Sequence, residues 1–83
     1  MATAPKVLIP DKEIDCIGLF CPIPIVKTRE AIHGMSVGEL LAMLSDDPAS
    51  DADMRSWCRG TGHDLVEVTR EGGVYRFLVR KTR

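Results

Sequence analysis

The sequence predicts an α+β two-layer sandwich of order β-α-β-α-β-β, with two helices packed on one face of a four-stranded mixed sheet. Three observations predict this fold class. Two stretches with helical spacing alternate with short apolar runs, two later runs flank a glycine pair, and 83 residues suit one small core. Helices and strands of such a domain each bury one face against the other layer. We therefore expect one domain over residues 11–83, preceded by a flexible lead-in over residues 1–10.

The first half of the chain contains a short strand and a helix. Lys12–Cys16 is the first expected strand. Pro22 or Pro24 opens the first helix, because proline suits the first helical positions, and Gly34 stands at its C-cap. At 100° per residue, one side of this helix gathers the residues expected to face the core: Ile25, Thr28, Ala31, Ile32 and Met35.

A continuous apolar run, "ELLAMLS" at residues 39–45, predicts a central strand covered on both sides. After this run, the sequence offers two alternative N-caps for the second helix. Asp47 can cap with Pro48 at the first helical position, or Ser50 can cap with Asp53 three residues later.

The second half continues with that helix and a hairpin. The helix ends at Gly60 and Gly62, and its apolar stripe consists of Met54, Trp57, Cys58 and Thr61. Leu65–Arg70 and Val74–Arg80 flank Glu71-Gly72-Gly73, which predicts a β-hairpin. In the last strand the alternation places Tyr75, Phe77 and Val79 on one face, opposite Arg76, Leu78 and Arg80.

Composition limits the classes of function. The formal net charge of −1 gives no general electrostatic reason to bind nucleic acid or an acidic membrane. Three cysteines are too few, and odd in number, for a secreted disulfide scaffold. Neither a signal peptide nor an apolar stretch of about 20 residues is visible. We expect a reduced cytoplasmic protein that needs no membrane and no direct nucleic-acid binding.

Cys21 stands out because Pro22 follows it directly and Pro24 lies two residues further on. If the first helix begins at Pro22, Cys21 is its N-cap, beside the free amides of Ile23 and Ile25 and the positive end of the helix dipole. Such a position lowers the pKa of a thiol and makes it a better nucleophile. The spacing alone equally fits a small capping or buried cysteine.

The motif Asp15-x-x-Gly18-x-x-Cys21-Pro22-x-Pro24 resembles that of the TusA/SirA-like sulfur carrier family. The resemblance covers roughly residues 13 to 81 and agrees with the order of elements above. Further similar positions are Gly38-Glu39, Asp46-Asp47-Pro48-Ala49, Cys58, Gly62-His63 and Tyr75-x-Phe77. The resemblance implies that residues 11–83 form a single sulfur-carrier domain.

The resemblance also implies a relay of sulfane sulfur. Cys21 accepts sulfur as a persulfide and passes it to a partner's cysteine, as an intermediate sulfurtransferase without a dissociable cofactor. Pro22 and Pro24 shape its loop, and Gly18 permits the preceding turn. The implied donor resembles a cysteine desulfurase or a rhodanese-like protein, and acceptors serve tRNA thiolation, molybdenum cofactor synthesis or sulfur oxidation.

This chain departs from the family pattern beside Cys21. Phe20 stands where members often have a basic residue, and Ile23 where some have an acidic one. The helical projection places Ile23 and Val26 away from the core, near Lys27, Glu30 and His33. We expect an apolar docking patch rimmed by charge; the alternative is two scattered surface residues.

Other readings of the thiols remain open. Cys16 is a candidate accessory thiol that forms a reversible disulfide with Cys21 in a redox switch, or a small residue that ends the first strand. Cys58 shares a stripe with Met54 and Trp57, which favours a buried structural thiol. The cysteines and histidines lack the spacing of a metal site, so no metal is expected. A non-catalytic interaction module is the remaining alternative.

Overall fold

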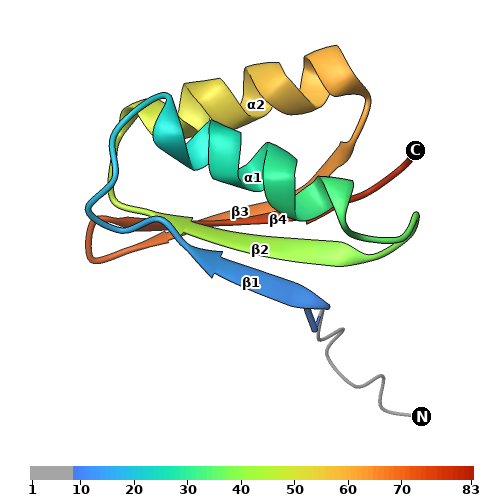
Figure 1. Cartoon of the computed structure of the whole chain (residues 1–83). Helices are drawn as coiled ribbons and strands as arrows, with labels where there is room; N and C mark the ends of the chain where they lie inside the picture. Colours follow the sequence, from blue (N-terminus) through green and yellow to red (C-terminus); the bar gives the residue numbers. More distant parts are fainter. Residues whose placement is uncertain (1–8) are drawn as a thin grey trace, which may run out of the picture.

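The computed structural model describes residues 9–83. Most of the expected lead-in over residues 1–10 lies outside these residues, and its boundary stays a prediction. Four strands and two helices follow in the predicted order. They are β1 (Lys12–Asp15), α1 (Ile23–His33), β2 (Leu40–Ser45), α2 (Ala49–Thr61), β3 (Asp64–Glu71) and β4 (Val74–Arg80). Figure 1 shows both helices on the same face of the sheet, which confirms the predicted two-layer sandwich.

The sheet has the strand order β1-β2-β4-β3. β1 pairs with β2 in parallel, and the other two pairings are antiparallel, so the sheet is mixed as predicted. The β3–β4 hairpin turns at Gly72 and Gly73, whose φ angles of 57° and 81° suit the tight turns of β-hairpins. Because β1 and β2 are parallel, the segments that follow them leave from the same edge of the sheet, and this edge carries the candidate site.

The start of α1 differs from the prediction. The helix begins at Ile23 with Pro22 as its N-cap, so Cys21 lies one residue before the cap and is not the cap itself. Pro24 occupies the second helical position and is buried. Two prolines at a helix start remove two amides that need no intrahelical partner, which explains why the helix tolerates both. The C-cap is Gly34, as predicted.

The start of α2 is also shifted by one residue. Pro48 is the N-cap and Ser50 lies inside the helix, so the predicted cap at Ser50 is wrong, and Pro48 precedes the first helical residue instead of occupying that position. Asp47 still contributes, because its Oδ1 accepts a hydrogen bond from the amide of Ala49 at 3.0 Å. Gly62 ends the helix in the left-handed conformation, with φ of 86°.

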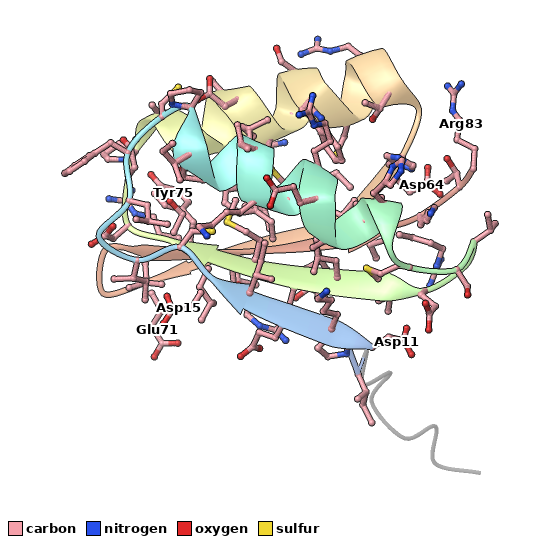
Figure 2. All side chains as sticks on the ribbon, viewed as in Figure 1. Asp11, Asp15, Asp64, Glu71, Tyr75 and Arg83 are labelled. Atoms are coloured by element: carbon pink, nitrogen blue, oxygen red, sulfur yellow. The ribbon has the colours of Figure 1, made fainter. Side chains whose placement is uncertain are left out.

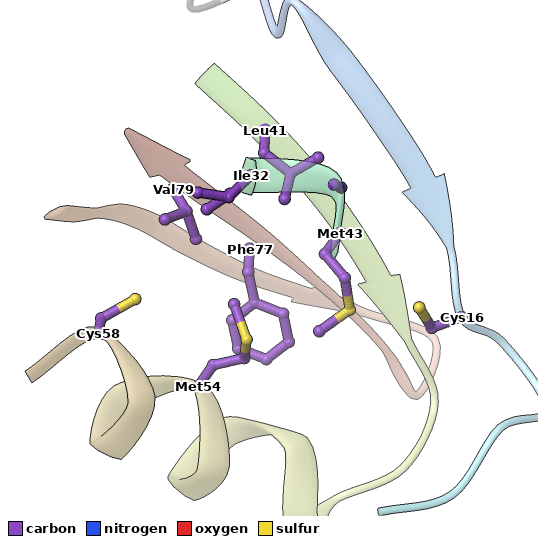
Figure 3. Packing of buried hydrophobic residues seen from close by; sticks show 9 residues of the cluster. Cys16, Ile32, Leu41, Met43, Met54, Cys58, Phe77 and Val79 are labelled. Carbon is purple, nitrogen blue, oxygen red and sulfur yellow. The ribbon is translucent and has the colours of Figure 1, made fainter. Parts of the chain in front are cut away.

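The core lies between the helices and the sheet. Met54 of α2 faces Phe77 of β4 at its centre, with Cys16 and Cys58 on opposite sides of the cluster in Figure 3. On α1, Thr28, Ala31 and Ile32 are buried as expected, while Ile25 and Met35 are partly buried against the cluster.

The other face of the sheet carries no helix. β2 is nevertheless a central strand, and Leu40 and Ala42 on this face are buried like Leu41 and Met43 on the helix side, so the predicted burial on both sides is confirmed although no helix covers the second side. Figure 2 shows Asp15 and Glu71 on this open face, whereas Tyr75 points toward the helices. Leu78 belongs to the open face but is only 2% exposed. It pairs with Ala42 of β2, and the alternation on β4 places it between two arginine residues, whose long stems cover apolar neighbours. In the described part of the chain, neither helix is long and apolar enough to cross a membrane.

Candidate functional site

Cys21 is exposed at the end of the segment that joins β1 to α1. The aspartates that follow β2 hold this segment through its backbone. The amide of Cys21 donates a hydrogen bond to Asp47 Oδ2 at 3.0 Å, and the amide of Gly18 donates to Asp46 Oδ1 at 2.9 Å. A loop that is exposed and has little packing of its own is therefore anchored at two amides.

Gly18 has a φ of 84°, in the left-handed region where a side chain is strained, although no atom lies close enough to contact an added Cβ. The turn around it is closed by the amide of Leu19, which donates to the Cys16 carbonyl oxygen at 3.1 Å. This turn takes the chain from the buried Cys16 to the exposed Cys21 within five residues.

The two prolines differ in their environment. Pro22 is exposed, and the peptide bond between Cys21 and Pro22 is cis. Pro24 is buried, and its carbonyl oxygen accepts a hydrogen bond from Thr28 Oγ1 at 2.8 Å. Pro24 therefore fixes the start of α1 against the core, and Pro22 joins this fixed point to the thiol.

The helix start offers the sulfur fewer free amides than predicted. The amide of Ile23 donates to the Phe20 carbonyl oxygen at 2.9 Å, so it is already engaged. Pro22 and Pro24 have no amide hydrogen. Of the two amides expected to face the sulfur, only that of Ile25 remains.

The predicted lowering of the Cys21 pKa is wrong in direction. Hydrogen bonding to Asp53 raises the pKa of the thiol, and desolvation and the negative charges of Asp53 and Asp47 raise it further. A carboxylate stabilises the S–H form that donates to it and repels the thiolate. Both carboxylates therefore favour the thiol form of Cys21 over the thiolate.

The other two cysteines lie in the core. Cys16 has no exposed surface, and burial raises its pKa, with the charge of Lys27 acting in the opposite direction. Burial raises the pKa of Cys58 to about 11. All three cysteines are free, and Cys21 is the exposed one. A disulfide between Cys16 and Cys21 would require Cys16 to leave the core.

Apolar side chains surround Cys21 on the surface. Of the expected docking patch, Ile23 is 42% exposed, Val26 is partly buried, and Lys27 and Glu30 are exposed. The structure adds two residues that this prediction did not include. Phe20 is 73% exposed, and Ile17 is 44% exposed. Ile17, Phe20 and Ile23, called the apolar rim below, are thus exposed apolar residues within four positions of the thiol in the sequence.

Asp47 and Asp53 are the residues at this site that sequence reasoning missed. The sequence predicts Asp47 as a helix cap and Asp53 as part of a capping box, and the family resemblance includes Asp47, but neither residue is predicted to contact Cys21. The order strand-helix-strand in the first half of the chain could have indicated their position. Two strands joined by a helix pair in parallel, and the segments that follow adjacent parallel strands meet at one edge of the sheet. Within residues 9–83, no group of three or more His, Cys, Asp or Glu side chains could hold a metal ion.

Comparisons with known proteins identify a similar fold and the family of the chain. A crystal structure of a SirA-like protein from Desulfitobacterium hafniense superposes with a TM-score of 0.75, at 23% identity, over 87% of this chain and 99% of that one. This likeness supports the fold.

Two relatives are closer in sequence. A protein of Archaeoglobus fulgidus described as a sulfur carrier is 43% identical over 70 residues, which cover 83% of this chain and 91% of that protein. The sulfur carrier protein TusA of Allochromatium vinosum is 38% identical over 72 residues, 87% of this chain and 95% of the relative. The family model described as sulfurtransferase TusA matches residues 12–81. With this match across nearly all of its length, the chain belongs to the TusA family of sulfurtransferases.

Proposed function

We propose that this protein is a sulfur-relay carrier that holds sulfane sulfur as a persulfide on Cys21 and delivers it to a cysteine of a partner protein. Membership in the family indicates a role in sulfur transfer in general. The observation that carries the assignment to Cys21 is exposure: Cys21 lies on the surface, whereas Cys16 and Cys58 are buried. A thiol that exchanges sulfur with another protein must be reachable by an incoming sulfur atom.

The transfer consists of two exchange steps. The Cys21 thiolate attacks the outer sulfur of a donor persulfide; the donor's S–S bond breaks, the donor cysteine leaves as a thiolate, and Cys21–S–SH forms. An acceptor thiolate then attacks the outer sulfur, and Cys21 leaves as a thiolate. Each step forms one S–S bond and breaks another, so neither requires an external oxidant or reductant.

Because carboxylates lie beside Cys21, the donor protein can activate the thiol when it binds. Asp53 and Asp47 raise the pKa of the thiol, so the free carrier is a weak nucleophile. A donor that brings lysine or arginine side chains to these carboxylates lowers that pKa when it docks. Attack is then favoured in the complex and disfavoured in isolation. The apolar rim of Ile17, Phe20 and Ile23 supplies contact area for such a partner.

Intact-protein mass spectrometry tests the proposal. The protein is incubated with a cysteine desulfurase and cysteine, alongside Cys21→Ser and Cys16→Ser variants. We expect one added sulfur in the wild type and in Cys16→Ser, removed by reduction, and none in Cys21→Ser. Circular dichroism of both variants checks that each is folded.

Other outcomes identify the alternatives. If neither a desulfurase nor a rhodanese-type donor loads sulfur, and oxidation removes two hydrogens only when Cys16 is present, the redox switch is correct. If Cys21→Ser keeps partner binding and cellular function, the protein is an interaction module. The relay needs a reduced thiol, so we propose a cytoplasmic location. Acceptors in tRNA thiolation, molybdenum cofactor synthesis and sulfur oxidation are all candidates.

A further inference from the structure

A second polar site lies at the opposite end of the helices from Cys21. A cleft of about 150 Å³ opens between the C-terminal ends of α1 and α2 and the residues that follow β4. Cys21 precedes α1, whereas the cleft is lined by Arg29, Ile32 and His33 from the second half of that helix. Figure 1 shows the segment between β1 and α1 at one end of the molecule and the C-terminal segment at the other.

Basic side chains from three segments line this cleft. Arg29 and His33 come from α1, His63 follows α2, and Lys81 and Arg83 follow β4. None of the side chains that line the cleft is a carboxylate. Among residues 9–83 the one salt bridge joins Arg55 to Asp51. The arginines and the lysine of the cleft therefore form no salt bridge within these residues.

The chain after β4 is fixed in place beside the cleft. Thr82 Oγ1 donates to the Gly62 carbonyl oxygen at 2.8 Å, and the amide of Thr82 donates to His63 Nδ1 at 3.2 Å. The guanidinium of Arg83 packs against Gly62, where an added Cβ would lie 2.5 Å from Nη2. Figure 2 shows Arg83 and Asp64 at this end of the molecule.

Donors remain available in the cleft. Because His63 Nδ1 accepts a hydrogen bond, the neutral ring carries its proton on Nε2 and donates there. Lys81 Nζ donates to the Met35 carbonyl oxygen at 2.6 Å, which uses one of its three protons. Through this bond the charge of Lys81 also stabilises the C-terminal end of α1, where the carbonyl groups carry partial negative charge.

Cationic side chains of the cleft act on the ring of His63. Burial lowers the pKa of His63, and the charges of Arg83 and Lys81 lower it further, while Asp64 raises it. Two cations thus act against one carboxylate at this ring. The ring of His63 packs against that of Trp57, with the centroids 5.4 Å apart and the planes tilted by 35°, so Trp57 gives the cleft an apolar wall.

We propose that this cleft binds a small tetrahedral oxyanion of the phosphate or sulfate type. Guanidinium groups pair with such oxygens through two parallel hydrogen bonds, and the donors converge from three segments of the chain. The volume is below the range of about 300–1,000 Å³ typical of pockets for larger ligands, which favours a small ion. This site is independent of Cys21 and of the proposed sulfur relay.

Titration with sodium sulfate, and in a parallel series with inorganic phosphate, tests the site. Sodium chloride keeps the ionic strength constant. Trp57 is the single tryptophan of the chain, so its fluorescence reports on the cleft, and NMR measures the pKa of His63. We expect a saturable fluorescence change and a rise in the His63 pKa with either anion. Arg83→Gln should weaken binding by about tenfold or more, because a charge-assisted hydrogen bond is lost.

Arg59→Gln is the matched control, because Arg59 is exposed near the end of α2 and does not line the cleft. It changes the net charge equally and should leave binding unchanged. Arg29→Gln provides a second cleft variant, expected to weaken binding if Arg83→Gln is unstable. Equal responses in the cleft variants and the control, or a response reproduced by chloride alone, would overturn the proposal. Sulfur loading on Cys21 is measured separately, so failure of one proposal leaves the other intact.

Discussion

One carboxylate joins the loop of Cys21 to the start of α2. Asp47 Oδ2 accepts the amide of Cys21 at 3.0 Å, and Asp47 Oδ1 accepts the amide of Ala49 at the same distance. The two backbone segments are 26 residues apart in the sequence at Cys21 and Asp47. The position of the thiol therefore depends on the second helix as well as on the helix that follows it.

Replacing Asp47 tests this connection. Asp47→Ala removes both acceptors, and since loss of a cap or a charged hydrogen bond each costs about 1–2 kcal/mol, we expect about 2 kcal/mol lower stability. Urea unfolding measures this change. Asp47→Asn keeps one oxygen acceptor and should lose less. Limited proteolysis should cleave the segment after Cys16 faster in Asp47→Ala. An unchanged unfolding midpoint and an unchanged cleavage rate would show that Asp47 does not hold the Cys21 loop in place.

Replacing Asp53 tests the cause of the raised pKa of Cys21. Asp53→Asn removes a negative charge and leaves a neutral amide oxygen as the weaker acceptor, so the thiol pKa should fall toward the ordinary value of about 8.5. The rate of alkylation by iodoacetamide, followed against pH, measures that pKa. The variant should react faster than wild type near neutral pH.

The control for this effect is Asp51→Asn. Asp51 lies on the same helix but pairs with Arg55 at 2.8 Å, so its loss should leave the alkylation profile in place. If both variants shift the profile equally, net charge rather than contact with Asp53 sets the thiol pKa.

Two buried serines support the segment between β2 and α2. Ser45 Oγ lies 2.6 Å from Ser50 Oγ and also accepts the amide of Asp47 at 3.2 Å. Ser45→Ala leaves a buried hydroxyl and an amide without this partner, which costs about 1–3 kcal/mol. Ser50→Ala should cost less, because Ser45 keeps its bond to Asp47. Thermal unfolding of both variants decides the order, and the reverse order would contradict this account.

His63 makes stability depend on pH. Its pKa in the folded protein is lowered by burial and by Arg83 and Lys81, below the unfolded value of about 6.5. The unfolded state then binds more protons in this window, so the free energy of unfolding should fall as the pH drops from about 6.5 through the folded pKa. Protonation also removes the acceptor for the amide of Thr82.

His63→Gln should remove this part of the pH dependence, and His33→Gln should retain it. Chemical unfolding at a series of pH values from neutral to acidic gives the difference between each variant and wild type. A His63→Gln curve parallel to that of wild type over the whole range would refute the assignment.

Phe20 is expected to contact sulfur-transfer partners. It is 73% exposed beside Cys21, and buried aromatic contacts dominate many interfaces, so Phe20→Ser should slow loading from a donor protein by about tenfold. Val37, 65% exposed after α1, is the matched control, and Val37→Ser should load normally. Loading from a small persulfide should be unchanged in both variants. Normal protein-dependent loading in Phe20→Ser would place the docking surface elsewhere.

The elements and their order could be predicted from the sequence alone. Helical spacing and the glycine turn are short-range signals, so they identified α1, α2 and the hairpin within one or two residues. The motif around Cys21 identified the family in the same way, because its residues are neighbours in the chain. The errors at Cys21 and Pro48 were also local: the structure placed each helix one residue after the predicted first position.

The charges around Cys21 could not be predicted from local sequence, because they come from segments that meet only in the folded chain. A helix start considered alone predicted a lowered thiol pKa, but parallel pairing of β1 with β2 brings the aspartates after β2 to the loop after β1. Asp53 then raises the pKa of Cys21 from a different helix. The cleft at the other end likewise gathers Arg29, His63 and Arg83 from three segments. Charge interactions depend on distance in space, which local sequence patterns do not report.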